Sequence, residues 1–255
     1  MSAHVPTRSV DPVRAERLAA VRAEVAGIEA GARHAHPLLP FGDAAIDAAL
    51  PGGGLATAAL HEAAGADTGL AADAAATVFL AGIAARLPGP VLWCRRAADL
   101  FAPGLAQAGL HPDRVIHVEL RSDADVLAAM EEGLRVPGLA AVVGEVRRLG
   151  LAPSRRLQLA AEAGGVTALV QRRARPGEAI DEPGAAATRW RLAPAPSAPL
   201  PLPTGLGRMR WRLSLVRARG ADAKDWIVEA CDAEGRLFVV PDAADRPAAL
   251  ASPVP

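Results

Sequence analysis

Gly65 and Gly69 precede an alanine-rich segment and form the strongest chemical pattern of the chain. A working phosphate-binding loop has the form G-x-x-x-x-G-K-[ST]: its N–H groups surround the phosphates, its lysine supplies positive charge and its hydroxyl binds Mg²⁺. Here only three residues separate the glycines, Leu70 takes the place of the lysine, and Ala71 and Ala72 take the place of the hydroxyl. The pattern predicts a nucleotide-binding scaffold without the groups that grip a triphosphate.

The remaining features of this loop favour an ordinary turn. Lys224 is the only lysine in the chain, so no nearby lysine can replace the missing one. Backbone N–H groups at a helix N-terminus bind phosphate weakly even without a lysine. Asp67, however, lies inside the loop and would repel an anion. We therefore expect a strand-to-helix turn, with no nucleotide cofactor and no metal.

Other catalytic patterns have little support. The chain contains no G-x-S-x-G, and His61-Glu62 lacks the second histidine of H-E-x-x-H. His34 and His36 are spaced for one face of a strand, but their surroundings favour a surface pair over a metal site. These absences predict that the protein is not an enzyme.

Arginines are concentrated in one part of a chain whose formal net charge is zero. Residues 145–219 carry 14 arginines and five acidic residues, which leaves a local excess of nine positive charges. Such a region can form a surface for an anionic partner, or simply a solvated surface with salt bridges. The candidate contacts for DNA or a protein are Arg147, Arg148, Arg155, Arg156, Arg172, Arg173, Arg175, Arg208, Arg210, Arg212, Arg217 and Arg219.

The composition favours a protein partner over DNA at these arginines. Only 3% of the residues are aromatic and none is tyrosine, so stacking platforms for single-stranded DNA are scarce. Direct DNA binding stays open as an alternative.

Cys94 and Cys231 are far apart, which favours reduced thiols, and the chain shows no signal peptide or membrane span. We expect a cytoplasmic protein.

Three regions are expected along the chain. Residues 1–36 form an N-terminal helical arm, in which helix 11–30 has an apolar stripe suited to docking. Residues 37–241 form the core, and residues 242–255 form a disordered tail. The stripe consists of Leu18, Val21, Val25 and Ile28.

Strands and helices alternate through most of the core. Continuous apolar strands separated by helices are typical of a parallel sheet with both faces covered. The late strands read as an antiparallel extension, which gives an α/β fold with a mostly parallel sheet flanked by helices and antiparallel C-terminal strands. The expected strands are 57–62, 90–94, 115–119, 139–143, 166–171, 187–192, 208–217, 225–230 and 236–240, and the core helices are 43–50, 71–86, 97–108, 123–135 and 153–163.

The order of these elements resembles the RecA-like recombinase core. The turn D-x-A-L-x-G-G-G-L over residues 47–55 and the later step L-P-G-P-V-L-W agree with it. In length and pattern the whole chain is similar to the ImuA family of bacterial inducible mutagenesis, which is related to the SulA-like division inhibitors.

The resemblance implies an accessory role without catalysis. An ImuA-type protein is expected to act in SOS-induced translesion DNA synthesis with an ImuB-type polymerase-like protein, an error-prone replicative-type polymerase and, as a further partner, RecA. A SulA-like division inhibitor and a direct single-stranded DNA-binding module are the alternatives.

The resemblance also assigns positions. Gly144, followed by Glu145, stands where a RecA-like ATPase has its metal-binding aspartate, and Arg95 and Arg96 stand where the water-activating carboxylate belongs. Gln171 matches the glutamine that senses the γ-phosphate, so it is a candidate relic sensor. Arg217 and Arg219 resemble the two basic residues that a neighbouring protomer inserts toward the nucleotide.

Overall fold

A computed structural model describes Arg17 and residues 37–173, 182–197 and 207–241. The chain divides into two units, residues 1–36 and residues 37–255, and the account below concerns the second. The expected arm with its stripe (Leu18, Val21, Val25 and Ile28), Arg175 and the tail lie outside the described residues. Within the described part, no helix is long and apolar enough to cross a membrane.

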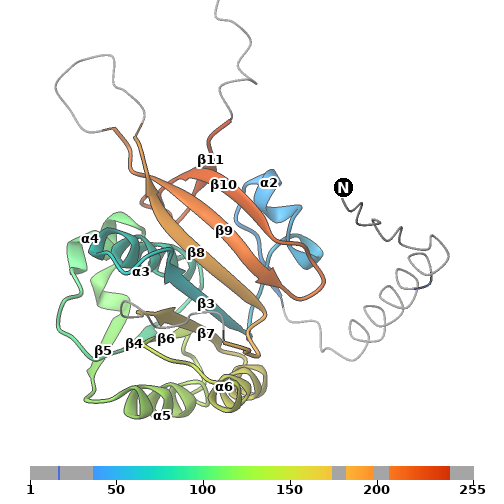
Figure 1. Cartoon of the computed structure of the whole chain (residues 1–255). Helices are drawn as coiled ribbons and strands as arrows, with labels where there is room; N and C mark the ends of the chain where they lie inside the picture. The colour runs from blue at the N-terminus through green and yellow to red at the C-terminus, as the bar shows by residue number, and fades with distance from the viewer. Residues whose placement is uncertain (1–16, 18–36, 174–181, 198–206, 242–255) are drawn as a thin grey trace, which may run out of the picture. The chain divides into compact units, whose positions relative to one another are not determined.

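The described residues of the second unit form a nine-stranded mixed sheet with helices against it (Figure 1). The strand order is β11-β10-β9-β8-β3-β7-β6-β4-β5. Pairing is parallel from β5 to β8, whereas β9, β10 and β11 are added antiparallel. The expected fold class, a mostly parallel α/β sheet with antiparallel C-terminal strands, is confirmed.

The elements have the following bounds. The sheet strands are β3 (Leu60–Gly65), β4 (Val91–Arg95), β5 (Val115–Glu119), β6 (Ala141–Val146), β7 (Thr167–Arg172), β8 (Thr188–Ala195), β9 (Arg210–Ala218), β10 (Lys224–Glu229) and β11 (Phe238–Val239). The helices are α2 (Ala44–Asp47), α3 (Leu70–Ala85), α4 (Ala102–Gln107), α5 (Asp123–Gly133) and α6 (Leu151–Gly164). A short ribbon pairs β1 (Leu38–Leu39) with β2 (Leu55–Ala56), and 3₁₀ turns occupy Pro51–Gly53 and Pro112–Arg114.

The central strands are buried because helices cover both faces of the sheet. Every residue of β3, β6 and β7 is buried, as expected for parallel strands between two layers of helices. Helices α3 and α4 contribute to one hydrophobic cluster, and α5 and α6 contribute to the cluster on the other face.

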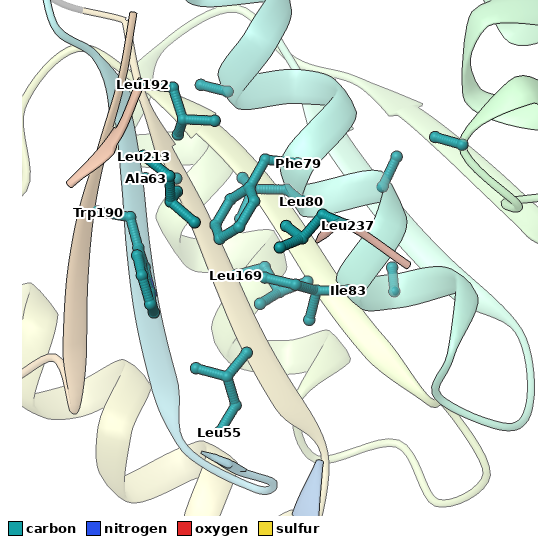
Figure 2. Packing of buried hydrophobic residues seen from close by; sticks show 14 of the residues in the cluster. Leu55, Ala63, Phe79, Leu80, Ile83, Leu169, Trp190, Leu192, Leu213 and Leu237 are labelled. Carbon is teal, nitrogen blue, oxygen red and sulfur yellow. The ribbon is translucent and has the colours of Figure 1, made fainter. Parts of the chain in front are cut away.

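Trp190 is at the centre of the α3 side of the core (Figure 2). Its ring lies 5.5 Å from the rings of Phe41 and Phe79 and 6.4 Å from that of Trp226, as measured between centroids. Leu192 and Leu213 continue the same cluster toward the antiparallel strands. Aromatic side chains from β8, β10 and α3 therefore bind the C-terminal strands to the helical layer.

Two expected strands are displaced in the structure. The strand expected at 57–62 is Leu60–Gly65, because Ala58 adopts a φ of 52° and the chain turns there before the sheet begins. The strand expected at 139–143 is Ala141–Val146, so Gly144 and Glu145 lie inside it. Gly144 packs directly against Met130, which leaves no room for a side chain.

Buried residues alternate with more exposed ones along most of β9. Trp211, Leu213 and Leu215 are buried while Arg212 is exposed, as expected for a strand covered on one face. The strand expected at 208–217 begins at Arg210, so Met209 precedes it and is 56% exposed.

A buried polar chain links β2, β3 and β8 through His61. The Trp190 indole donates to the Thr188 hydroxyl at 2.8 Å, and this hydroxyl lies 2.7 Å from Nδ1 of His61. The other ring nitrogen lies 2.8 Å from the Ala56 carbonyl oxygen. An uncharged ring with its proton on Nε2 satisfies all three contacts. Burial lowers the pKa of His61 from 6.5 to about 4.

This histidine makes stability depend on pH. Its pKa is depressed in the folded chain, so the unfolded chain binds a proton first as the pH falls through 6.5. The free energy of unfolding therefore falls by about 2 kcal/mol from this residue between pH 7.5 and pH 5, following proton linkage. Urea unfolding of the wild type and of His61→Gln at both pH values measures this difference.

The matched control is His111→Gln, at an exposed position in a loop. We expect this variant to keep the pH dependence of the wild type. In His61→Gln, the fall in the free energy of unfolding between pH 7.5 and pH 5 should be smaller by about 2 kcal/mol. Equal pH dependence in all three proteins would contradict the assignment.

Candidate functional site at the carboxyl ends of the parallel strands

The carboxyl ends of β4, β6 and β7 meet the first half of α3, the usual position for a ligand site in an open α/β sheet. A hollow of about 360 Å³ lies there between α3 and α4. It is lined by Leu70, Ala74, Thr77, Val78, Asp99, Leu100, Phe101, Gly104, Leu105, Glu145 and Arg173.

Arg173, directly after β7, is at the centre of the charged side of this hollow. Its Nη1 donates to Glu145 at 2.8 Å, and its Nη2 donates to Asp99 at 2.8 Å. Its Nε lies 3.6 Å from a carboxylate oxygen of Asp73 on α3. Trp93 on β4 donates its indole N–H to Glu145 at 2.8 Å. We call Asp73, Asp99, Glu145 and Arg173 the strand-end cluster.

Burial and the guanidinium act in opposite directions on the acids of the strand-end cluster. Burial raises the pKa of Glu145 and of Asp73, and the positive charge of Arg173 offsets part of this effect. The more exposed Asp99 has a lowered pKa because it accepts hydrogen bonds from Arg173. The same bonds raise the pKa of Arg173. The cluster thus has a permanent cation at its centre.

Gln171, the candidate relic sensor, has both polar atoms of its side-chain amide engaged in hydrogen bonds. Its side-chain oxygen accepts from the Thr77 hydroxyl at 2.9 Å, and its nitrogen donates to the Asp73 carbonyl at 2.9 Å. The residue is fully buried. Gln171 therefore links β7 to α3, and its side-chain oxygen and nitrogen are both hydrogen-bonded within the chain.

Two N–H groups of the loop between Gly65 and Gly69 donate hydrogen bonds to other residues of the chain. Asp67 accepts a hydrogen bond from the Gly69 N–H at 2.7 Å, and the Ala66 N–H donates to the Leu192 carbonyl at 2.8 Å. Gly65 ends β3, and a Cβ there would lie 2.9 Å from the Cβ of Ala72. These glycines thus permit a tight strand-to-helix turn, and Asp67 occupies one N–H that a phosphate would need.

The expected loss of carboxylates from this site needs a correction. Glu145 does reach the strand end, because β6 extends to Val146, and Asp99 supplies a second carboxylate four residues after β4. Sequence reasoning placed only Arg95 and Arg96 after that strand, and these pair with Glu119 and Asp123. An acidic residue at the end of an apolar strand near a tryptophan was the available signal. Among the described residues, no three or more His, Cys, Asp and Glu side chains are placed to hold a metal ion.

Arg172 lies on the opposite face of the sheet and is 1% exposed. It lies 3.6 Å from Glu62 of β3 and 3.5 Å from Glu182, and Arg189 of β8 lies 3.2 Å from Glu62. Burial lowers the pKa of Arg172. The expectation that Arg172 contacts DNA or a partner is inconsistent with this interior position.

Arg217 and Arg219 hold the backbone that leads into β8. Arg217 donates to the Gly184 carbonyl at 3.1 Å, and Arg219 donates to the Ala185 carbonyl. Insertion of these two arginines into a neighbouring protomer stays a prediction. Their guanidinium groups are engaged within the chain.

The remaining arginine candidates are distributed over several surfaces. Arg208 and Arg210 lie 3.5 Å and 3.3 Å from Glu229 of β10, and Arg212 is exposed on β9. The backbone N–H groups of Arg147 and Arg148 donate to Asp123, ahead of α6. Arg155 and Arg156 are exposed on α6, with Arg156 3.4 Å from Glu131.

Fold and site together define an α/β protein whose strand-end site contains an arginine–carboxylate cluster. The curated "Protein ImuA" of Caulobacter vibrioides, strain NA1000, is 43% identical over 216 residues, which cover 81% of this chain and 88% of that protein. ImuA of strain CB 15 of the same bacterium matches equally. The chain belongs to the ImuA family.

A second similarity is more partial. The crystal structure of SulA from Pseudomonas aeruginosa is 25% identical and matches 44% of this chain and 96% of that chain, with a TM-score of 0.38. This score is too low to support an argument. No model of a known protein family matches the chain.

Arg173→Met leaves Glu145 buried without its cation. We expect the free energy of unfolding to fall by about 2–4 kcal/mol, because breaking one side of a largely buried ion pair strands the other charge. Chemical denaturation at pH 7.5 measures this loss. Arg173→Met combined with Glu145→Gln should recover part of it.

Arg155→Met is the control, since that arginine is exposed on α6. A change within about 0.5 kcal/mol is expected there. If Arg173→Met were as mild, Arg173 would not be the cation that stabilises the cluster.

Proposed function

We propose that this protein is a non-catalytic, RecA-like accessory protein of SOS-induced translesion DNA synthesis. It assembles with an ImuB-type polymerase-like protein and an error-prone replicative-type polymerase. Membership of the ImuA family supports the process. The observation that carries the non-catalytic role is the Arg173 guanidinium, which is held by three carboxyl groups at the strand ends.

Phosphoryl transfer depends on positioning and on neutralising the charge of the transferred group. The strand-end site offers the opposite charge pattern, because in the described part of the chain three carboxyl groups surround one cation, Arg173. Leu70, in the lysine position, is 83% exposed and apolar, and Asp67 faces the loop N–H groups. A triphosphate seated here would meet carboxylates and a leucine, which disfavours both its binding and its hydrolysis.

The preserved architecture supports a recognition role. In this proposal the parallel sheet and its two helical layers act as the recognition surfaces of a RecA-like core. The candidate sensor and both candidate finger arginines make internal contacts. A protein of this kind acts through its surfaces. The candidate docking element for the ImuB-type protein or for RecA is the N-terminal arm, with the stripe Leu18, Val21, Val25 and Ile28.

Mg²⁺–ATP is expected to bind no more tightly than about 1 mM, equivalent to about −4 kcal/mol. The reason is the replacement of lysine and hydroxyl by Leu70, Ala71 and Ala72. Isothermal titration calorimetry of the full chain measures this affinity. Micromolar binding would contradict the proposal.

The full chain is expected to bind a purified ImuB-type protein with a measurable Kd in biolayer interferometry. A paired substitution in the stripe, Val21→Asp with Val25→Asp, should weaken this binding if the arm docks. Failure of the wild type to bind the ImuB-type protein would refute the adaptor role.

The same instrument separates the alternatives. Salt-sensitive binding to a labelled dT oligonucleotide would favour the DNA-binding module. Binding to the tubulin-like division protein, without binding to the ImuB-type protein, would favour a SulA-like inhibitor.

A further inference from the structure

The hollow between α3 and α4 has an apolar wall that is open to solvent. Leu70 is 83% exposed and Phe101 is 69% exposed, and both line the hollow. Ala74 is exposed, Val78 is half-buried and Leu105 is buried, and all three also line the hollow. These two large apolar side chains border one hollow, and an exposed apolar rim around a cavity is typical of an interaction site.

The opposite side of the hollow is acidic. Asp99, Glu145 and the neighbouring Asp73 provide three carboxyl groups against the one guanidinium of Arg173, a formal charge of −2. Among the residues that the structure describes, the further charges that act on Asp73 and Asp99 do not reverse this sign. Asp67 adds another carboxylate, and Arg95 is paired with Glu119. A ligand that is positively charged and apolar fits both walls.

Hydrogen bonds and core packing within the chain fix the shape of the hollow. The Gln171 amide holds α3 through the Thr77 hydroxyl and the Asp73 carbonyl, and Leu105 anchors α4 in the core on the α3 side. The Phe101 carbonyl accepts the N–H groups of Gly104 and Leu105 at the start of α4. A preformed cavity loses little conformational entropy on binding, which favours affinity.

We propose that this hollow is the docking site for a segment of the ImuB-type partner that carries an aliphatic or aromatic side chain beside a lysine or arginine. The inference rests on the proposed function. The apolar side chain enters between Leu70 and Phe101, and the basic group lies against Asp99, whose side chain is 48% exposed. Nucleic acid is disfavoured because its phosphates would face the carboxylates.

The test compares binding of the purified ImuB-type protein to full-length variants by biolayer interferometry. Leu70→Ser with Phe101→Ser should weaken the Kd at least about tenfold, since buried apolar anchors dominate interfaces. Leu159→Ser, which removes a 64% exposed leucine from α6, is the matched control and should leave the Kd unchanged. Thermal melting of each variant verifies folding.

A second experiment tests the charge contact with the variant Asp99→Asn. Raising the salt from about 50 to 300 mM should weaken wild-type binding more than binding by this variant, because salt screens the charge pair. Asp113→Asn, at an 87% exposed side chain elsewhere, should keep the wild-type salt response. An identical salt response of Asp99→Asn and wild type would overturn the basic partner group.

A photo-crosslinking residue at position 101 identifies the segment. We expect a crosslinked partner peptide with a lysine or arginine close to an apolar residue, and no competition by ATP or a dT oligonucleotide. An acidic peptide, or competition by either compound, would overturn the proposal.

The outcomes distinguish failure of this docking site from failure of the proposed adaptor role. Wild-type binding that survives the double substitution refutes this docking site and leaves the adaptor role standing. Absence of wild-type binding refutes the adaptor role, and with it this site.

Discussion

The contact between Arg173 and the carboxyl groups of Asp99 and Glu145 is the constraint on which the strand-end region depends. Glu145 is buried in a central strand, where an unpaired carboxylate would be strongly destabilising. Arg173 supplies a delocalised cation with enough donors to reach β6, the segment after β4 and α3 together. A lysine has one ammonium group and could not hold the same three acids in this planar arrangement.

The two faces of the sheet use consecutive residues of one strand for different tasks. Gln171 faces α3, Arg172 faces α6, and Arg173 returns to the α3 side, because side chains alternate along a strand. On the α6 side, Arg172 and Arg189 share Glu62, and Arg189 also donates to the Glu182 carbonyl. The sheet therefore carries one ion cluster on each face at the same end of the central strands.

This arrangement fills the carboxyl ends of the central strands with charged groups that already have partners within the chain. The guanidinium of Arg173 and the carboxyl groups of Asp73, Asp99 and Glu145 offset one another in part, and the excess of carboxyl groups disfavours an anionic ligand there. What remains open is a hollow with an apolar rim and an acidic side. A surface of this kind discriminates by charge sign as well as by shape.

The sequence alone determined the α/β class, the order of its strands and helices, the apolar Leu70 directly after Gly69, and the turn at Gly65 and Gly69. These follow from local patterns, since hydrophobic periodicity and glycine positions report on neighbouring residues. Tertiary structure decided which arginines are surface groups. Arg172 and Arg173 are adjacent and chemically identical, yet their partners Glu62 and Glu145 come from distant strands, and only strand pairing and register bring each pair together.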